Sequence, residues 1–369
     1  MPKVYDIDKE ENKKEIITIL QKAVQSAHLN FLIGAGCSYP AIQILGSIEQ
    51  EVQAKIDGGD NNGAELQIFN FLKPFLVATT KLKCTSTSCI DTQKTISNYK
   101  SFLWNISQIL FERKSNIIPK QATIFSTNYD MFVEKAHEDN RLPIKLNDGF
   151  SRNPTLNETF RFSSSEFFSF IHNIGNLYHY EVKKPSINLI KLHGSLSWKS
   201  IANEIIFSLA DAEAILEQHE KMDLFDLFEP TPEDFIEIEK FNQNFSLIFP
   251  KKDKFKDTLL KQVHYDLLRL YANELDKENT LLIAEGFSFA DEHIFEITKR
   301  ALKNPTLKLI IFCYGKAELN SYQTKFSSFN NVDILYSETI NIDFSVFNDL
   351  MTELLPLTVN RTMEAVLNE

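Results

Sequence analysis

The chain has 369 residues, of which 43% are hydrophobic and 24% are charged, which is the composition of an ordinary globular protein. Its 11 glycines and 12 prolines are too few for a disordered or collagen-like chain, and a chain of this length buries a large core without disulfides or metals. The formal net charge of −11 argues against binding nucleic acid through bulk charge, so we expect no direct sequence-specific nucleic-acid binding.

Two further classes are disfavoured by the sequence. No stretch approaches the roughly 18 apolar residues of a membrane-spanning helix, and the charged N-terminal segment does not resemble a secretory signal. The four cysteines are scattered and include no CxxC pair, so they predict neither a disulfide framework nor a zinc site. We therefore expect a cytoplasmic protein that does not bind a membrane and contains no structural zinc.

The first third of the chain alternates between helical and strand patterns. Apolar residues at helical spacing over 15–28 predict an amphipathic helix, and a short buried strand follows from residue 30. Residues 41–120 have helical periodicity almost throughout, with polar turns between the pieces, and this predicts an inserted helical subdomain. Another short apolar strand is predicted at 122–126.

The rest of the chain continues this alternation after an irregular segment at 140–185. Residues 211–240 carry 11 acidic and 2 basic side chains, a net charge of −9. This acidic excursion favours a solvated helical surface, and a docking face for a basic partner is the alternative. The remaining expected elements are strands at 187–192, 245–249, 280–284, 307–312 and 332–335, and helices at 255–275, 291–302 and 317–326.

Strands that alternate with helices predict an α/β protein with a Rossmann-like, mainly parallel sheet and an inserted helical subdomain. We expect a Rossmann-type domain built from residues 1–40 and 121–340, which includes an acidic helical excursion at 210–240. The helical insert is expected at 41–120 and a C-terminal helical tail at 341–369.

Polar residues and glycines collect where four of these strands end. Ligands of an open parallel sheet bind beyond the carboxyl ends of its strands, so we expect a ligand site at that edge. The four motifs are GAGCS at 34–38, TNYD at 127–130, HGS at 193–195 and GFSFAD at 286–291.

Each motif taken alone has two interpretations. The glycines of GAGCS suit close backbone approach to a pyrophosphate, but the motif alone favours a plain strand-to-helix turn. Asn128 and Asp130 are either helix caps or ligand contacts, and His193 is either a hydrogen-bonded core residue or a functional group in a strand-end loop. A hydride-transfer enzyme is disfavoured, because GxGxxG is incomplete and no acid ends a second strand about twenty residues later. A phosphate-loop ATPase is excluded, because the chain has no GxxxxGK[ST].

Taken together and in this order, the four motifs resemble those of the sirtuin-like NAD-consuming family, over residues 15 to 335. GAGCS resembles the first phosphate turn of that family, and TNYD is similar to the form found in its bacterial members. Leu192-His193-Gly194 resembles the LHG of the catalytic histidine. Residues 286–293 resemble the late G[YF]SFxDxHI segment.

The resemblance implies a role for each motif residue. Asn128 would hold the nicotinamide ribose or the attacking water, and His193 would be the general base at the ribose. The turn at 34–38 would line the phosphates and the nicotinamide ribose, Asp130 would accept from the carboxamide, and the residues after 285 would contact the adenosine ribose. The implied NAD⁺-binding set comprises Gly34, Ala35, Gly36, Ser38, Asp130, Gly286 and Ser288.

Two departures from the protein deacylases of this family bear on the reaction. The chain reads YPAIQILG at 39–46 in place of a GIPDFR-type segment, and its four cysteines cannot build the zinc module of the deacylases. Both favour hydrolysis of NAD⁺ as substrate, which yields nicotinamide and ADP-ribose. The alternatives are an NAD⁺-dependent protein deacylase and a non-catalytic scaffold that binds NAD⁺ or ADP-ribose.

The same departures make the chain similar to stand-alone bacterial antiphage members of the family. That resemblance implies a toxin that depletes NAD⁺ in abortive infection and that forms a homo-oligomer. It also implies a HerA-type hexameric ATPase, a DNA translocase, as a partner.

Overall fold

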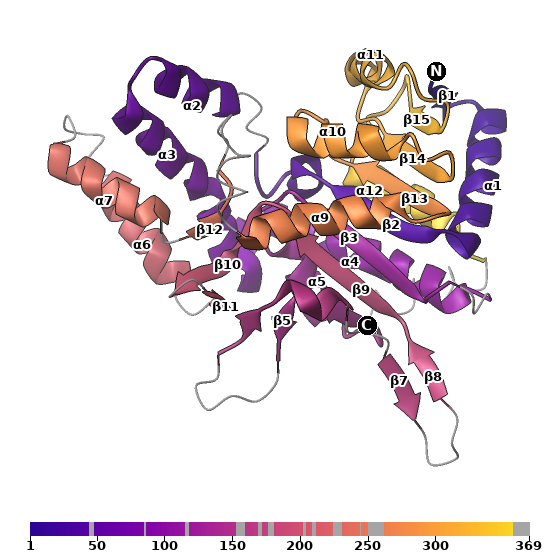
Figure 1. Cartoon of the computed structure of the whole chain (residues 1–369), viewed down its shortest axis with the longest axis horizontal. Coiled ribbons are helices and arrows are strands. Elements are labelled where there is room, and N and C mark those ends of the chain that lie inside the picture. Colours follow the sequence, from indigo (N-terminus) through magenta and orange to yellow (C-terminus); the bar gives the residue numbers. More distant parts are fainter. Residues whose placement is uncertain are drawn as a thin grey trace.

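The computed structural model describes residues 1–43, 48–84, 86–114, 118–152, 159–168, 172–175, 181–201, 204–208, 212–223, 231–243, 245–249 and 262–356 (Figure 1). An eight-stranded sheet runs through the molecule in the order β1-β15-β14-β13-β2-β3-β9-β4, and every neighbouring pair in it is parallel. The prediction of a Rossmann-like α/β fold is confirmed. Its strands are β1 (Lys3–Asp6), β2 (His28–Ile33), β3 (Gln121–Ser126), β4 (Lys145–Asn147), β9 (Ser186–Lys191), β13 (Thr280–Glu285), β14 (Leu307–Phe312) and β15 (Val332–Tyr336).

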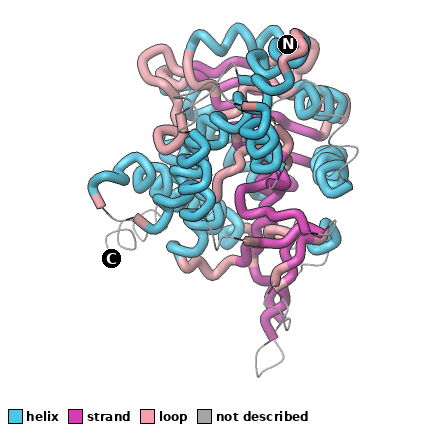
Figure 2. Tube along the Cα trace, turned by 90° about the vertical axis from the view of Figure 1, so that its left-hand side faces the viewer, coloured by secondary structure: helices cyan, strands magenta, loops and turns pink. Residues whose placement is uncertain are grey.

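The central strands are apolar runs because both of their faces are covered by helices, as parallel sheets require. Along β2, Phe31 and Ile33 belong to one hydrophobic cluster and Leu32 to the other, so successive side chains enter opposite layers. Figure 2 shows helices on either side of the strands. One layer contains α1 (Glu10–Ser26), α4 (Ile90–Glu112), α5 (Phe132–Asn140) and α12 (Phe344–Thr352), and the other contains α9 (Gln262–Asp276), α10 (Glu292–Ala301) and α11 (Lys316–Lys325).

The sequence did not predict a second sheet, which is antiparallel and has the order β12-β10-β11-β6-β5. The strand expected at 245–249 belongs to this sheet, and residues expected to be irregular supply two of its short strands. Strands of two to four residues are too short for an alternation pattern to be recognised. The sheet comprises β5 (Phe150–Ser151), β6 (Arg161–Phe162), β10 (Gly194–Ile201), β11 (Glu204–Phe207) and β12 (Phe245–Leu247), and a separate hairpin comprises β7 (His172–Gly175) and β8 (Glu181–Lys184).

The helices between β2 and β3 have two different environments. α4 packs on the central sheet, where the rings of Phe102 and Phe31 meet edge to face at 5.1 Å. α2 (Ile48–Asp57) and α3 (Asn61–Thr80) instead gather with α6 (Ala212–Asp223) and α7 (Pro232–Gln243) beside the sheet (Figure 1). The Phe69 ring of α3 stacks on His219 of α6 at 3.8 Å, which joins the two segments although 150 positions separate them.

Parts of the expected helical segments lie outside the described residues. The acidic excursion is described in α6 and α7 but not at 224–230, and the C-terminal tail is described through residue 356. Within the described part of the chain, no helix has both the length and the apolar character needed to cross a membrane.

Two of the four cysteines form a disulfide, which the sequence did not predict. Cys84 and Cys89 bond to each other in the connection between α3 and α4, with their Cα atoms 6.2 Å apart. This separation lies inside the usual range of roughly 4.4–6.8 Å for a disulfide. Cys37 and Cys313 are buried free thiols.

Candidate active site

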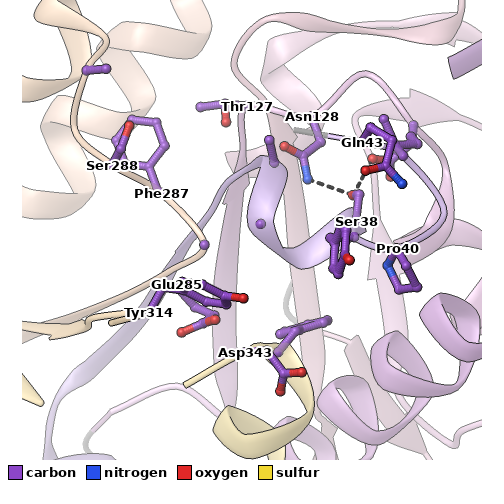
Figure 3. Close-up of a pocket in the computed structure, with 18 of the residues that line it drawn as sticks. Ser38, Pro40, Gln43, Thr127, Asn128, Glu285, Phe287, Ser288, Tyr314 and Asp343 are labelled. Carbon is purple, nitrogen blue, oxygen red and sulfur yellow. Dashed lines mark hydrogen bonds between the residues drawn. The ribbon is translucent and has the colours of Figure 1, made fainter. Parts of the chain in front are cut away.

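A cavity of about 510 Å³ lies at the carboxyl edge of the central sheet, among the turns that follow β2, β3, β9 and β13 (Figure 3). Its size is within the range of about 300–1,000 Å³ typical of small-molecule and cofactor sites. α3 and α4 contribute Phe71, Phe75 and Asn98 to its wall. The predicted site residues that line the cavity are Ala35, Gly36, Ser38, Asn128, Asp130, His193, Gly286 and Ser288.

The glycines after β2 allow two strand-end turns to touch. The Gly34 amide donates to the Glu285 carbonyl at 3.1 Å, and the Gly36 amide donates to the Gly286 carbonyl at 3.0 Å. A Cβ atom on Gly34 would lie 2.4 Å from the Gly286 carbonyl oxygen, closer than any side chain tolerates. Gly286 itself has φ +62°, in the left-handed region that favours glycine. The contact between these two turns therefore explains the glycines of GAGCS before any ligand is considered.

The contact between the turns also marks the point where the strand order reverses. From β2 the chain proceeds to β3 on one side, and it later returns to place β13 on the other side. In open α/β sheets, ligands bind in the crevice beyond such a switch point. The cavity lies where this topology predicts a ligand.

Asn128 is held by three hydrogen bonds that fix its amide. Nδ2 donates to the Gly34 carbonyl at 2.8 Å, to Ser38 Oγ at 3.0 Å and to Tyr99 Oη at 3.4 Å. Oδ1 points away from Ser38 in Figure 3, and no described residue hydrogen-bonds it. Asn128 is therefore not a helix cap, and it presents an acceptor oxygen to the cavity.

Both carboxylate oxygens of Asp130 accept hydrogen bonds from within the protein. Oδ1 accepts from the amide of Phe132, the first residue of α5, at 3.2 Å. Oδ2 accepts from Ser38 Oγ at 2.6 Å and so connects the turn after β3 to the turn after β2. Tyr99 Oη lies 3.1 Å from the same serine oxygen, and burial raises the pKa of Tyr99 well above its usual value, so its phenol stays protonated.

His193 faces a carboxylate across the cavity edge. Nε2 lies 3.2 Å from Oδ2 of Asp291, and 14% of the imidazole side chain is exposed. When Nε2 carries the proton toward the carboxylate, the lone pair of the neutral ring is on Nδ1. His193 is thus an oriented imidazole at a cavity edge and not a plug of the core.

The turn that carries His193 is shaped by Gly194. This residue has φ +83°, and a Cβ atom there would lie 2.2 Å from the Ser246 carbonyl oxygen of β12. In the same turn the His193 carbonyl accepts from the Ile248 amide at 2.9 Å. The second sheet therefore holds the backbone on both sides of the imidazole.

Sequence reasoning assigned no role to three residues of this site. Asp291 belongs to the motif at 286–291 and begins an expected helix, and in the structure it caps α10. Glu285 directly follows the apolar strand expected at 280–284, and this position was a signal that could have been used. Tyr99 lies mid-helix in α4, and nothing in the sequence distinguishes it from a core aromatic residue.

A parallel α/β sheet with a glycine turn at its switch point, an oriented imidazole and a fixed asparagine amide defines a nucleotide-binding protein of the Rossmann-like class. The model of the SIR2-like domain matches residues 122–334, which is more than half of the chain, and the chain belongs to this family. Family membership indicates NAD-related activity and NAD⁺ use. No curated protein sequence matches the chain.

Among the residues that the structure describes, no three His, Cys, Asp or Glu side chains gather in a group that could hold a metal ion.

Proposed function

We propose that this protein is an NAD⁺ glycohydrolase, which cleaves NAD⁺ to nicotinamide and ADP-ribose. The observation that carries the proposal is the convergence of Asn128 and His193 on one cavity beside the glycine turns, although 65 positions separate them in the chain. The site thus combines a phosphate-binding turn, an acceptor oxygen and a base. These are the groups that hydrolysis of an N-glycosidic bond needs.

The reaction replaces one bond to the anomeric carbon with another. The bond from C1′ of the nicotinamide ribose to the ring nitrogen breaks, and its electron pair leaves with nicotinamide, which becomes neutral. The ribose passes through an oxocarbenium-like state, and the oxygen of a water molecule bonds to C1′. The water loses one proton, so the products are nicotinamide, ADP-ribose and H⁺.

In our proposal each site residue has a separate role in this reaction. Asn128 Oδ1 accepts a hydrogen bond from the water or from a ribose hydroxyl and so orients it toward C1′. His193 takes the proton on Nδ1, and the carboxylate of Asp291 stabilises the imidazolium that results. Ser38 and the turn at 34–38 border the diphosphate, because the glycines of this turn let the backbone approach it closely.

Hydrolysis also fits the cysteine pattern better than deacylation does. Cys84 and Cys89, the two cysteines that lie close together in the sequence, are bonded to each other in the structure. We propose that the activity depletes NAD⁺ in antiphage defence, with a HerA-type hexameric ATPase as partner and a homo-oligomeric state. The support for this setting is the motif resemblance to bacterial antiphage members of the family.

The test measures nicotinamide release from NAD⁺ by mass spectrometry, with and without the proposed partner. His193→Ala is expected to lower the rate by about 10² to 10⁴, and Asn128→Ala by about 10² or more. Both variants are expected to unfold within a few degrees of the parent, because neither side chain fills the core. Near-normal turnover by a folded His193→Ala protein would contradict the catalytic role.

The same assay separates the two alternative functions. A deacylase releases nicotinamide only when an acylated peptide is added. A scaffold binds ADP-ribose and releases no nicotinamide under any of these conditions.

A further inference from the structure

An acidic residue ends the strand next to the glycine-turn strand. β13 ends at Glu285, whose register partner on β2 is Ile33, the residue directly before Gly34. In dinucleotide-binding folds, an Asp or Glu near the glycine turn hydrogen-bonds the ribose 2′-hydroxyl, whereas an Arg accommodates a 2′-phosphate. The sequence lacked such an acid twenty residues after the turn. The sheet supplies one from about 250 positions away.

The Glu285 side chain has the properties of a ligand-binding group. The residue is 3% exposed, it lines the cavity, and its Oε2 atom is buried without a hydrogen-bond partner among the described residues. Burial and the neighbouring carboxylate of Asp343 raise its pKa well above the usual value, which favours the neutral carboxylic acid. A neutral carboxyl group both donates and accepts, as a ribose hydroxyl does.

The surroundings of Glu285 identify which end of the ligand it meets. In the proposed function, His193 and Asn128 mark the nicotinamide end of the cavity, and Figure 3 shows the turn that carries Ser38 between Asn128 and Glu285. Asp343 and Tyr314 line the same end as Glu285, and the Ile342 amide donates to the Tyr314 carbonyl at 2.9 Å (Figure 3). This end therefore meets the adenosine half of a dinucleotide whose diphosphate lies at the turns.

The charges at this end do not suit a phosphate. No arginine occurs among the described residues that line the cavity, and its lysine, Lys94, comes from α4 and not from β13, β14 or α12. A 2′-phosphate would have to enter beside Asp343 and a buried carboxyl group without a cation from these elements. The site therefore disfavours a phosphorylated ribose.

We propose that Glu285 is the specificity-determining residue of this cavity: its carboxyl group hydrogen-bonds the 2′-hydroxyl of the adenosine ribose and so selects a dinucleotide without a 2′-phosphate. The inference rests on the proposed function, because that function sets the orientation of the ligand. It adds the substrate class, NAD⁺ in preference to NADP⁺, and the residue that makes the choice.

The test compares two ligands that carry no nicotinamide, ADP-ribose and 2′-phospho-ADP-ribose, by isothermal titration calorimetry. The parent protein is expected to bind ADP-ribose at least about tenfold more tightly, because a site built to hydrogen-bond a hydroxyl rejects analogues that lack it. Glu285→Ala is expected to weaken ADP-ribose binding and reduce the preference to below about threefold. Glu285→Gln also donates and accepts, so it is expected to retain most of the preference.

Asp333→Asn is the matched control, because Asp333 is a buried acid of β15 that pairs with Lys308 at 2.7 Å and does not line the cavity. It is expected to leave the preference unchanged. Equal affinity of the parent for both ligands would overturn this inference and leave NAD⁺ hydrolysis standing, and so would an unchanged preference in Glu285→Ala. Absence of ADP-ribose binding together with absence of nicotinamide release would overturn both. If Glu285→Ala does not fold, equal affinity of the parent for the two ligands still overturns the inference, and a larger side chain without a carboxyl group, Glu285→Leu, replaces the alanine variant.

Discussion

The two carboxylate oxygens of Asp291 have different partners. Oδ1 accepts from the amides of His293 and Ile294 at 3.0 and 3.2 Å and so caps α10, whereas Oδ2 faces His193. One residue therefore both begins a helix and orients the imidazole. Because the two oxygens have separate partners, a substitution can change the contact with His193 and keep the cap of α10.

Asp291→Asn keeps the capping oxygen and turns an amide NH₂ toward His193. We expect nicotinamide release to fall by about 10² or more, because the amide favours the wrong imidazole tautomer. The free energy of unfolding should change by less than about 1 kcal/mol, because the cap remains. Asp60→Asn is the control, since Asp60 caps α3 in the same way through the Gly63 amide at 2.8 Å and lies outside the cavity. Full activity in Asp291→Asn would show that the carboxylate does not act through His193.

Glu285 makes the stability of the protein depend on pH. Its pKa is raised above the usual value of 4.5 in the folded state, so above about pH 5 the unfolded chain releases a proton that the folded chain keeps. The stability associated with this group is therefore fully present below the unfolded pKa and is lost as the pH rises toward the folded pKa. Glu285→Gln, which cannot ionise, is expected to gain stability relative to the parent as the pH rises from about 5 to about 8. Urea unfolding at both pH values measures this, and a difference that does not change with pH would contradict it.

The turns after β2 and β13 act as one element because their backbones are in contact. A Cβ atom on Gly36 would lie 2.7 Å from Gly286 Cα, so an alanine there must push the two turns apart. Neither turn is a separate unit, although each follows a different strand. The geometry of the proposed diphosphate site therefore depends on both turns.

Gly36→Ala is expected to lower the free energy of unfolding by about 1–3 kcal/mol through overpacking, and to abolish most of the activity. Gly315→Ala is the matched control. Gly315 also follows a central strand, but a Cβ atom there meets only the side-chain ends of Glu318 and Asn341, at 3.3 and 3.4 Å. We expect the control to unfold like the parent, and equal stability of the two variants in thermal unfolding would contradict the contact between the turns.

At the scale of the whole molecule, the acidic helix α7 lies beside the central sheet, and none of its residues lines the cavity. The exposed acids Glu233, Glu237 and Glu239 belong to α7, which packs on α3 at the side of the sheet (Figure 1). A basic partner that binds the exposed side of α7 therefore does not cover the mouth of the cavity by this contact. This placement suits the docking interpretation of the acidic segment.

Reversal of these three charges to lysine is expected to weaken co-purification with a HerA-type ATPase at least about tenfold, and more at low salt than at high salt. Intrinsic NAD⁺ hydrolysis should be unchanged, because none of the three side chains lines the cavity. Glu10→Lys with Glu11→Lys, on the exposed start of α1, is the control for charge alone. Association that survives the α7 reversal would exclude this surface as the docking face.

The sequence by itself determined the class of fold and the edge at which the site lies. Buried parallel strands are short apolar runs such as 307–312, which a periodicity analysis detects, and the carboxyl ends of parallel strands meet at one edge. Asn128, Asp130 and His193 followed such strands, so their placement could be predicted from local pattern alone. In the second sheet the strand at 245–249 was expected, whereas β5, β6 and β11, of two to four residues, were too short to be predicted in this way.

Only the tertiary structure decided how these groups are connected. The partners of these three side chains come from the turns after other strands and from helix α4, up to about 100 positions away. Local patterns contain no information on such contacts. The same limit explains why Glu285 had no assigned role. Its position at the end of an apolar run was visible in the sequence. Its neighbour in the sheet, Ile33, was not visible, because the order of the strands is set by the packing of the whole chain.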